Sequence, residues 1–289
     1  MKKYILLYLL VVNSTALFGP PSAYQDADAA WLSNQIYDGV HTMNTDSGSV
    51  IYSHTSDKYG AFAIWKQKNV GDCYLVIRGT KTFSDFLTDI SVSEITDNEI
   101  GVKVHKGVYQ RSQFILNTID DKLKVCNTDI IITGHSLGGA IAHYLYLKYV
   151  KRHYYDWGQK EKARNFKAVM FGAPQLITKT SEPMLLLYEI MSINWYKYNN
   201  DCVPEIIHTL TSIPYYLIFS YFSGFFSITK YTYDILKTVS YGYYIPGHRY
   251  LLLDNGKKET YSFNPLKNKS ISDHVNFKLT VDLLTKIWG

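Results

Sequence analysis

A serine between glycines, in the order Gly134-His135-Ser136-Leu137-Gly138, is the part of the sequence best suited to chemistry. The β-branched run from Ile130 to Thr133 precedes it and predicts a strand buried on both faces. Apolar residues then recur at helical spacing, at Ala140, Ile141, Tyr144 and Leu145. A strand, a tight turn and a helix in this order are typical of a nucleophile elbow, which exposes a serine hydroxyl at the carboxyl end of the strand. We therefore predict Ser136 to be a nucleophile.

A helix that begins directly after Ser136 would direct free backbone N–H groups and a partial positive charge toward this site. Such groups stabilise the oxyanion that forms when a hydroxyl attacks a carbonyl carbon. The alternative is a glycine-rich turn with an incidental serine, because a bare Gly-x-Ser-x-Gly also arises by chance. The flanking strand and helix favour the catalytic interpretation.

Acyl transfer from a serine also requires a base and a group that orients this base. In hydrolases with a nucleophile elbow, the acid follows the serine along the chain and the histidine follows the acid. Asp201 fits the acid, because it comes just after the predicted strand that ends at Tyr198. The alternative for Asp201 is an ordinary turn aspartate ahead of Pro204.

Three histidines follow Asp201, namely His208, His248 and His274. His208 follows Asp201 too closely in sequence for a separate loop to bring its side chain back to the active site. His248 opens a predicted strand behind Pro246-Gly247 and could be a structural turn residue. His274 precedes the last predicted helix, where a late loop can reach the carboxyl edge of the sheet. We therefore predict His274, rather than His248, to be the base.

The elements that must position these residues alternate between strand and helix. Strands are predicted at 61–65, 74–77, 130–133, 166–171, 193–198, 248–253 and 260–263, and helices at 28–37, 108–125, from 140 onward and from 275 onward. The first two strands read as a hairpin. This alternation favours an α/β fold with a mainly parallel central sheet and helices on both faces. Residues 81–104 mix apolar and acidic positions and are interpreted as a mobile amphipathic segment.

With 289 residues, 46% of them hydrophobic, the chain is long enough for one large domain with a substantial core. Its net charge of +5 is modest. A basic cluster from Lys148 to Lys167 is interrupted by Asp156 and Glu161 and carries no nucleic-acid motif. It is expected to be a solvated helix end and loop, with attraction to anionic lipid as the weaker alternative. Nucleic acid is not expected as a partner.

Residues 1–19 are typical of a signal peptide. Met1-Lys2-Lys3 is charged, Tyr4 to Val12 is apolar, and Asn13 to Ala16 provides small residues for cleavage near Ala16. An uncleaved anchor or a hydrophobic N-terminal strand is the alternative. We expect residues 20–289 to form a single domain that is secreted or lies in the endomembrane lumen, with or without membrane association.

Three cysteines, Cys73, Cys126 and Cys202, leave two arrangements open. Cys73 and Cys126 each precede a predicted strand, so they could pair if those strands are neighbours. The alternative is three reduced, buried thiols that behave as small hydrophobic residues.

An apolar insertion at about 208–246 separates Asp201 from His274. Its uncharged part, 209–229, is rich in aromatic residues and is long enough to span a bilayer, but Pro214 and Gly224 disfavour a span. A span would also put the acid and the base on opposite sides of the membrane. We interpret the insertion first as an interfacial lid or acyl-binding cap, then as a core insertion, and last as a re-entrant element.

Together these residues carry a family resemblance. The chain resembles the class 3 (fungal triacylglycerol lipase-like) family of the α/β-hydrolase fold. The matching pieces follow the order of the family: Val76-Ile77-Arg78-Gly79-Thr80, Asp85-Phe86-Leu87-Thr88-Asp89, Val104-His105-Lys106-Gly107-Val108-Tyr109, Gly134 to Gly139, Phe171-Gly172-Ala173-Pro174, Asn200-Asp201-Cys202-Val203-Pro204 and Asp273-His274.

The resemblance implies a serine carboxylester hydrolase that cleaves acyl esters of glycerolipids, triacylglycerol first, at a membrane or droplet interface. It implies Ser136, Asp201 and His274 as the catalytic triad, and Thr80 and Leu137 as donors to the oxyanion. A lid would follow Thr80. This chemistry requires no metal or organic cofactor. A phospholipase or galactolipase of the same mechanism is the alternative within enzymes, and a lipid-binding protein with a degenerate site is the alternative outside them.

Overall fold

The computed structural model describes residues 20–80, 93–155, 165–198, 201, 203–205, 247–253, 258–260 and 281. Several predictions fall outside these residues: the leader at 1–19, residues 81–92 of the amphipathic segment, nearly all of the apolar insertion, Cys202, His274, and the C-terminal helix apart from Val281. In the part of the chain that is described, no helix is long and apolar enough to cross a membrane.

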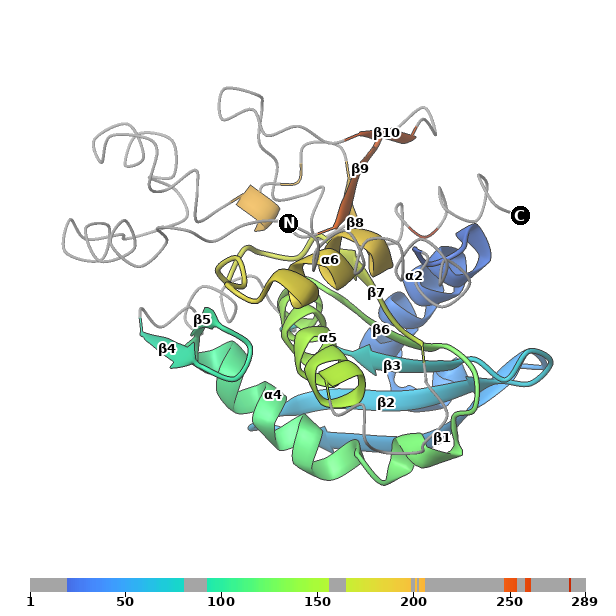
Figure 1. The fold of residues 1–289 in the computed structure, drawn as a ribbon. Helices are drawn as coiled ribbons and strands as arrows, with labels where there is room; N and C mark the ends of the chain where they lie inside the picture. The colour runs from blue at the N-terminus through green and yellow to red at the C-terminus, as the bar shows by residue number, and fades with distance from the viewer. Residues whose placement is uncertain are drawn as a thin grey trace, which may run out of the picture.

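An eight-stranded sheet, in the order β1-β2-β3-β6-β7-β8-β9-β10, forms the centre of the protein (Figure 1). Its strands are β1 (Gly48–Ser56), β2 (Gly60–Gln67), β3 (Cys73–Ile77), β6 (Ile130–His135), β7 (Phe166–Phe171), β8 (Ile193–Tyr198), β9 (His248–Leu252) and β10 (Lys258–Thr260). The five strands from β3 to β9 in this order are parallel. The strands β1, β2 and β10 pair antiparallel at the two sides. The predicted hairpin of β2 and β3 is therefore confirmed.

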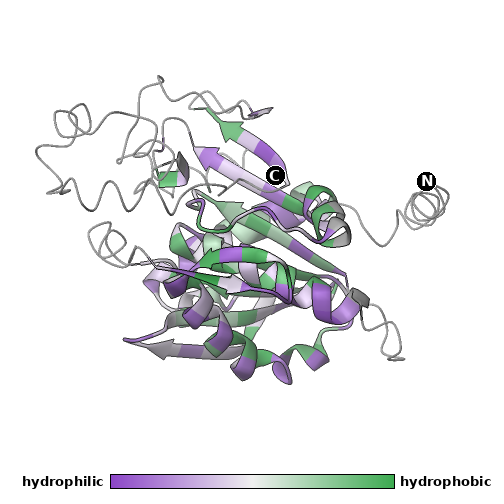
Figure 2. Cartoon of the chain, turned by 60° about the vertical axis from the view of Figure 1, so that its left-hand side comes forward, coloured by the Kyte–Doolittle hydropathy of each residue, from purple (hydrophilic) through white to green (hydrophobic). Residues whose placement is uncertain are grey.

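Helices cover both faces of this sheet. On one face lie α4 (Lys106–Ile119), α5 (Leu137–Tyr155) and α6 (Pro183–Ser192), and α2 (Ala23–Asp38) lies on the other. The buried apolar side chains form two clusters, one with the residues of α4 to α6 and one with those of α2. Figure 2 shows hydrophobic residues concentrated where helices and strands face each other. The predicted mainly parallel sheet with helices on both faces is confirmed.

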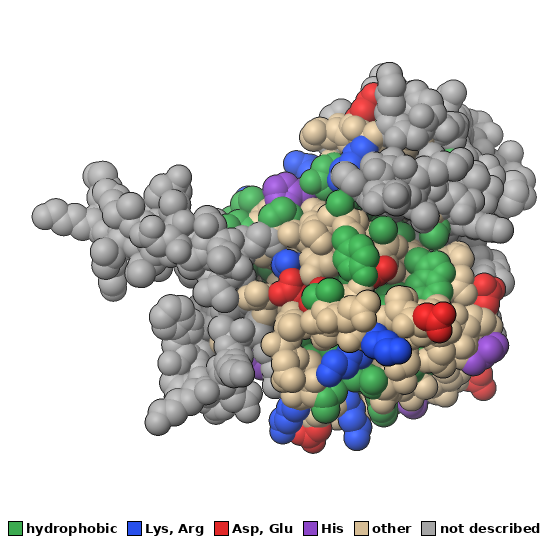
Figure 3. Space-filling model, turned by 90° about the vertical axis from the view of Figure 1, so that its right-hand side faces the viewer, with side chains coloured by type: hydrophobic (Ala, Val, Ile, Leu, Met, Phe, Trp, Pro, Cys, Tyr) green, Lys and Arg blue, Asp and Glu red, His purple; other side chains and the backbone are tan. Residues whose placement is uncertain are grey.

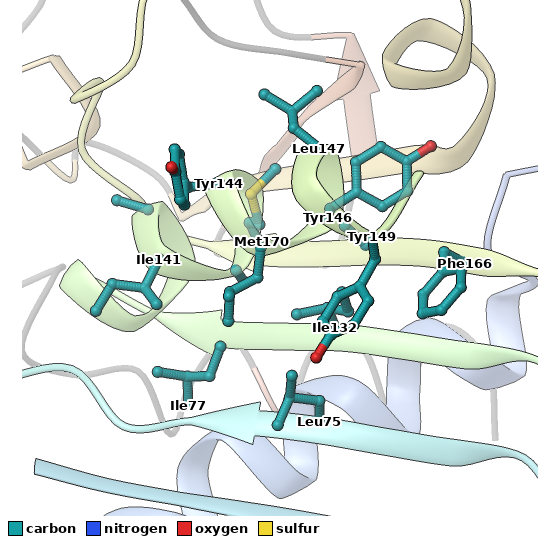
Figure 4. Packing of buried hydrophobic residues seen from close by; sticks show 14 of the residues in the cluster. Leu75, Ile77, Ile132, Ile141, Tyr144, Tyr146, Leu147, Tyr149, Phe166 and Met170 are labelled. Carbon is teal, nitrogen blue, oxygen red and sulfur yellow. The ribbon is translucent and has the colours of Figure 1, made fainter. Parts of the chain in front are cut away.

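Helix α5 follows Ser136 directly and is buried on all sides over residues 137–150. In Figure 4, its side chains at Ile141 and Tyr149 point toward the strands that carry Ile77 and Ile132. The Tyr149 ring stacks on Phe166 of β7, with ring centroids 5.1 Å apart. A helix that is buried all round belongs to the core, because each of its faces packs against another element. Ser136, the residue before α5, is therefore attached to a helix that the core holds in place.

Helix α2 begins at Ala23, earlier than the predicted start at Asp28. The reason is a capping box: the Ser22 hydroxyl accepts from the N–H of Gln25, and the Gln25 side chain accepts from the N–H of Ser22. This exchange satisfies two N–H groups that would otherwise lack partners at a helix start. It extends α2 to the amino edge of the sheet.

The amino end of α2 is fixed to this edge by a polar network. Gln25 donates to Asp72 and Asp129, at 2.8 and 2.9 Å, in the loops that lead into β3 and β6. Asp26 is buried and accepts from Asn194 in β8. Burial raises the pKa of Asp26 to about 6, although its hydrogen bonds act in the opposite direction. The other end of α2, which carries Tyr37, therefore lies toward the carboxyl edge.

Three further elements differ from the sequence prediction. Strand β1 was not predicted, because its apolar positions are interrupted by serine, threonine and histidine. Helix α6 was not predicted either. The helix predicted at 108–125 ends at Ile119 and is followed by a turn and the short 3₁₀ helix η2 (Lys122–Val125). Two other 3₁₀ turns, η1 (Val40–Met43) and η3 (Val203–Glu205), complete the described elements.

The interpretation of residues 81–104 as one mobile amphipathic segment was wrong in its second half. Residues 94–105 form an antiparallel hairpin of β4 (Glu94–Asp97) and β5 (Val102–His105). Val102 and Val104 are buried in the α4–α6 core, and Ile100 in the turn is buried with them. Three buried apolar side chains give this hairpin enough packing to order it.

The interpretation of the basic cluster from Lys148 to Lys167 as a solvated helix end and loop was wrong at Lys148 and Lys167, while residues 156–164 lie outside the described residues. Lys148 is buried and its ammonium binds Asp97 at 3.1 Å and also contacts Glu99. Lys167 binds Asp129 at 2.6 Å. A buried ammonium is costly unless it is paired, and these carboxylates meet that requirement. On the face shown in Figure 3, charges of both signs are interspersed with hydrophobic side chains in the described part.

Cys73 and Cys126 form a disulfide, with Cα atoms 5.9 Å apart. Cys73 is the first residue of β3, and β3 pairs with β6, which begins just after Cys126. The condition stated from the sequence, that the two strands are neighbours, is therefore met. Of the two arrangements left open, the paired one is confirmed.

Candidate active site

Ser136 lies at the turn between β6 and α5, with a φ of 57°. Within the described residues it is the one non-glycine residue with a positive φ. This left-handed conformation costs an L-residue about 1–2 kcal/mol, so the surrounding structure must hold it in place. The Ser136 N–H donates to the carbonyl of Phe171 in β7 at 2.9 Å, and the Ser136 carbonyl accepts from Gly139. The strand, strained turn and helix predicted from the sequence are all present.

Helix α5 begins at Leu137, so the Leu137 N–H is among the first N–H groups of the helix, which have no partner within it. The partial positive charge of the helix start is added to these groups at the same place. Both features favour a negative charge next to Ser136. Leu137 therefore lies where a donor to an oxyanion is required.

Gly138 allows the start of α5 to contact the end of β3. A Cβ atom at this position would lie 2.1 Å from the Ile77 carbonyl oxygen and 2.9 Å from the Gly79 nitrogen. Both neighbours are backbone atoms that cannot rotate away, so any side chain here would force the two segments apart. The second glycine of the motif thus brings the loop after β3 into contact with the nucleophile turn.

This loop, residues 78–80, is held on both sides. On the α4 side, the Arg111 guanidinium donates to the Arg78 carbonyl. On the α2 side, the Tyr37 hydroxyl lies against Gly79, since a Cβ there would lie 2.5 Å from it. The same Cβ would lie 3.2 Å from Ser136 Cβ. Thr80, the next residue, is half-buried beside this contact.

Asp201 lies just beyond β8 and is buried, with 2% of its surface exposed. Its backbone N–H donates to the Tyr198 carbonyl at 2.9 Å, and its Oδ1 accepts from the Val203 N–H at 2.9 Å. Strand β7 separates β6 from β8, so the carboxyl ends that carry Ser136 and Asp201 lie about 10 Å apart. This separation fits one imidazole between the two side chains.

His248 lies at the other edge of the sheet. It begins β9 and pairs with Asn194, near the start of β8, whereas Asp201 follows the end of β8. At about 3.3 Å per residue, more than 10 Å of strand separates His248 from the level of Asp201. Burial, and then the nearby Lys258 ammonium, lower the pKa of His248. This geometry agrees with the sequence-based preference against His248.

The other described histidines that make specific contacts have structural roles. His143 pairs with Glu189 between α5 and α6, and the His105 side chain accepts from the Gly107 N–H at the start of α4. His54 stacks on Phe62. The predicted base, His274, lies outside the described residues, so the structure brings together four of the five predicted site residues: Thr80, Ser136, Leu137 and Asp201.

Sequence reasoning missed Tyr37 and Arg111, the two side chains that hold the loop at 78–80. Tyr37 ends a predicted helix and Arg111 lies within one, and no motif surrounds either of them. Both contacts are made across long stretches of sequence, so no local pattern could have identified them.

A mainly parallel sheet, a strained serine between β6 and α5, and an acid after β8 define an α/β-hydrolase fold. Comparison with known proteins gives the family within this fold. The family model described as lipase (class 3) matches residues 74–210. This part of the chain is therefore similar to the class 3 lipase family, in agreement with the resemblance found in the sequence.

A lipase of Rhizopus niveus is 39% identical to this chain over 84 residues, which are 27% of this chain and 20% of the relative. The chain thus spans about a fifth of the length of the curated relatives it matches. The triacylglyceride lipase of Rhizomucor miehei has the same fold, with a TM-score of 0.59 and 17% identity, over 89% of this chain and 94% of that one.

A second solved structure is a triacylglycerol lipase whose catalytic centre is described as a serine protease triad. It matches with a TM-score of 0.56 and 17% identity, over 91% of this chain and 92% of that one. At these identities the two structural matches establish the fold. The similarity to the family comes from the sequence match at 74–210.

Proposed function

We propose that this protein is a serine carboxylester hydrolase that cleaves acyl esters of glycerolipids, with triacylglycerol as its first substrate class. The observation that carries the proposal is Ser136, a residue held at a φ of 57° between β6 and the start of α5. Ser136 is buried, and backbone strain of this kind clusters at active sites, where the surrounding structure holds it in place. Similarity to a lipase family supports the same conclusion.

The proposed reaction has two halves. The Ser136 Oγ attacks the ester carbonyl carbon while His274 takes the serine proton, and the tetrahedral intermediate then expels the alcohol, which receives that proton from His274. Water, deprotonated by His274, next attacks the acyl-enzyme carbonyl, and His274 returns this proton to the Ser136 Oγ as the fatty acid leaves. Asp201 orients the imidazole and stabilises its positive charge.

Thr80 and Leu137 are proposed to bind the oxyanion. The Leu137 N–H belongs to the first turn of α5, and Thr80 follows Gly79, which contacts Ser136. Ser136 and Leu137 are buried, and such donors contribute most where water is excluded. Two relatives of the same fold, from Rhizomucor miehei and in the second structural match, are described as lipases of triacylglycerol, which supports the choice of substrate.

The disulfide supports the proposed location. Disulfides between neighbouring strands persist in oxidising compartments and are rare where thiols are kept reduced. The Cys73–Cys126 pair therefore favours a secreted or endomembrane-lumenal protein, in line with the leader predicted at 1–19. The protein would then bind its lipid substrate at the water–lipid interface.

Labelling with a fluorophosphonate tests the mechanism. Such a probe phosphonylates an activated serine and mimics the tetrahedral intermediate, so we expect stoichiometric labelling that maps to the peptide containing Ser136. Labelling at another serine, or no labelling of a folded chain, would contradict the proposal. Hydrolysis rates on triacylglycerol, phospholipid and galactolipid, each with and without an interface, would then identify the preferred lipid.

A pair of histidine variants tests the base. His274→Ala is expected to lower kcat by about 10⁴-fold or more, because no other group then accepts the serine proton. His248→Ala serves as the matched control, since His248 lies at the opposite edge of the sheet, and its kcat should stay within about twofold of the wild type. Loss of activity in the control alone would transfer the role to His248.

A further inference from the structure

Tyr37 is the point where α2 reaches the candidate active site. Its ring packs edge-on against His135, with centroids 5.9 Å apart and an interplanar angle of 67°. Burial raises the pKa of the Tyr37 hydroxyl to about 12, with hydrogen bonding from the Gly79 backbone acting in the opposite direction. The hydroxyl is therefore neutral and holds its proton throughout the physiological range.

This one hydroxyl joins two loops. The Tyr37 hydroxyl lies directly against Gly79, since a Cβ there would lie 2.5 Å from its oxygen. The same oxygen is hydrogen-bonded to His135 Nδ1 at 3.1 Å. Tyr37 therefore contacts the loop after β3 on one side and the turn before Ser136 on the other.

Gly79 and His135, the two residues that contact the Tyr37 hydroxyl, immediately precede Thr80 and Ser136. Their loops leave the neighbouring parallel strands β3 and β6, and they also touch each other at Gly79 and Ser136. The Tyr37 hydroxyl packs against Gly79 in one loop and is hydrogen-bonded to His135 in the other. These two contacts limit how far Thr80 and Ser136 can move apart.

We propose that Tyr37 is a positioning residue, whose hydroxyl holds the oxyanion loop at a fixed distance from the nucleophile turn. The inference rests on the proposed function, because it assigns Thr80 and Ser136 their catalytic roles. Without the hydroxyl, the site would still bind the ester, but the Thr80 donor would no longer be held in the place where the oxyanion forms.

The test is Tyr37→Phe, which keeps the ring and removes the hydroxyl with its hydrogen bond to His135 and its contact with Gly79. On a soluble short-chain ester, kcat per active site is expected to fall about 10- to 100-fold while KM stays within about twofold, since a displacement of about 1 Å in an active site has effects of this size. Active sites are counted by end-point fluorophosphonate titration, so a partly unfolded preparation does not lower the measured kcat.

Tyr74→Phe is the matched control. Tyr74 is a buried tyrosine on the same face of the sheet, and its hydroxyl donates to Asp28 of α2 at 3.2 Å. It lies near the start of β3, at the other end of the strand from the loop at 78–80. Removing the Tyr74 hydroxyl should change the melting temperature by about as much as Tyr37→Phe does. It should leave kcat per active site at the wild-type value.

If Tyr37→Phe does not fold, variants of its partner provide the same test. His135→Leu removes the partner of the Tyr37 hydroxyl and should lower kcat in the same way, and His135→Asn, whose side-chain amide can take the place of Nδ1, should recover most of that loss. A kcat for Tyr37→Phe within twofold of the wild type, or an equal loss in Tyr74→Phe, would overturn the positioning role while the proposed function stands. A wild-type chain that neither hydrolyses the ester nor takes the label would overturn both.

Discussion

Ser136→Ala is expected to lower kcat on a soluble short-chain ester by about 10⁴- to 10⁶-fold and to abolish fluorophosphonate labelling. The substitution removes the attacking oxygen. The remaining rate would come only from the proposed oxyanion donors at Thr80 and Leu137 and from substrate binding. Alanine and serine have a similar cost at a φ of 57°, so the free energy of unfolding should change by less than about 1 kcal/mol. Melting temperature and ester hydrolysis, measured on the same preparation, separate the two effects.

Ser112→Ala is the matched control for this experiment. Ser112 is buried in α4, and among the described residues its hydroxyl has no hydrogen-bond partner. Its removal should therefore leave both activity and melting temperature close to those of the wild type. Turnover by Ser136→Ala within tenfold of the wild type would rule out Ser136 as the nucleophile.

Replacing both Cys73 and Cys126 by alanine is expected to lower the free energy of unfolding by about 4 kcal/mol, because the disulfide closes a long loop and restricts the unfolded chain. For a chain of this size, the melting temperature should fall by about 10 °C. The disulfide lies at the amino ends of β3 and β6, and Ser136 lies at the carboxyl end of β6. We therefore expect kcat at low temperature to be unchanged.

Reductant provides the control for this pair of substitutions. It should lower the melting temperature of the wild type to that of the double variant and should leave the variant unaffected. An unfolding midpoint that is the same in urea for wild type and variant would show that the cross-link contributes nothing to stability.

The elbow could be predicted from the sequence because its signals are local. The apolar run before Ser136, the glycines around it and the helical spacing after it lie within a short stretch. Strands β7 and β8 were predicted with the bounds that the structure has, since each is a short run rich in β-branched and aromatic residues and is almost fully buried. Asp201 followed from the end of β8, and the order of the parallel strands brings it near Ser136.

What could not be predicted depends on contacts between distant residues. Lys148 looks like a solvated lysine in the sequence, and only the hairpin of β4 and β5 provides the carboxylates that allow it to be buried. Strand β1 has little apolar pattern of its own and is ordered by pairing with β2. The roles of Tyr37 and Arg111 are visible only when α2, α4 and the loop after β3 are seen together.

The position of α2 has a consequence for the extent of the proposed hydrolase. The family match starts at Tyr74, yet α2 lies well before it, and its Tyr37 hydroxyl contacts both the loop after β3 and the turn before Ser136. The first turn of α2 is hydrogen-bonded to residues at the opposite edge of the sheet, so the helix connects the two edges. For the proposed hydrolase, the smallest active stretch of chain would therefore be longer than the stretch that matches the family, and a truncation designed from the family boundary would remove a helix that contacts the candidate active site.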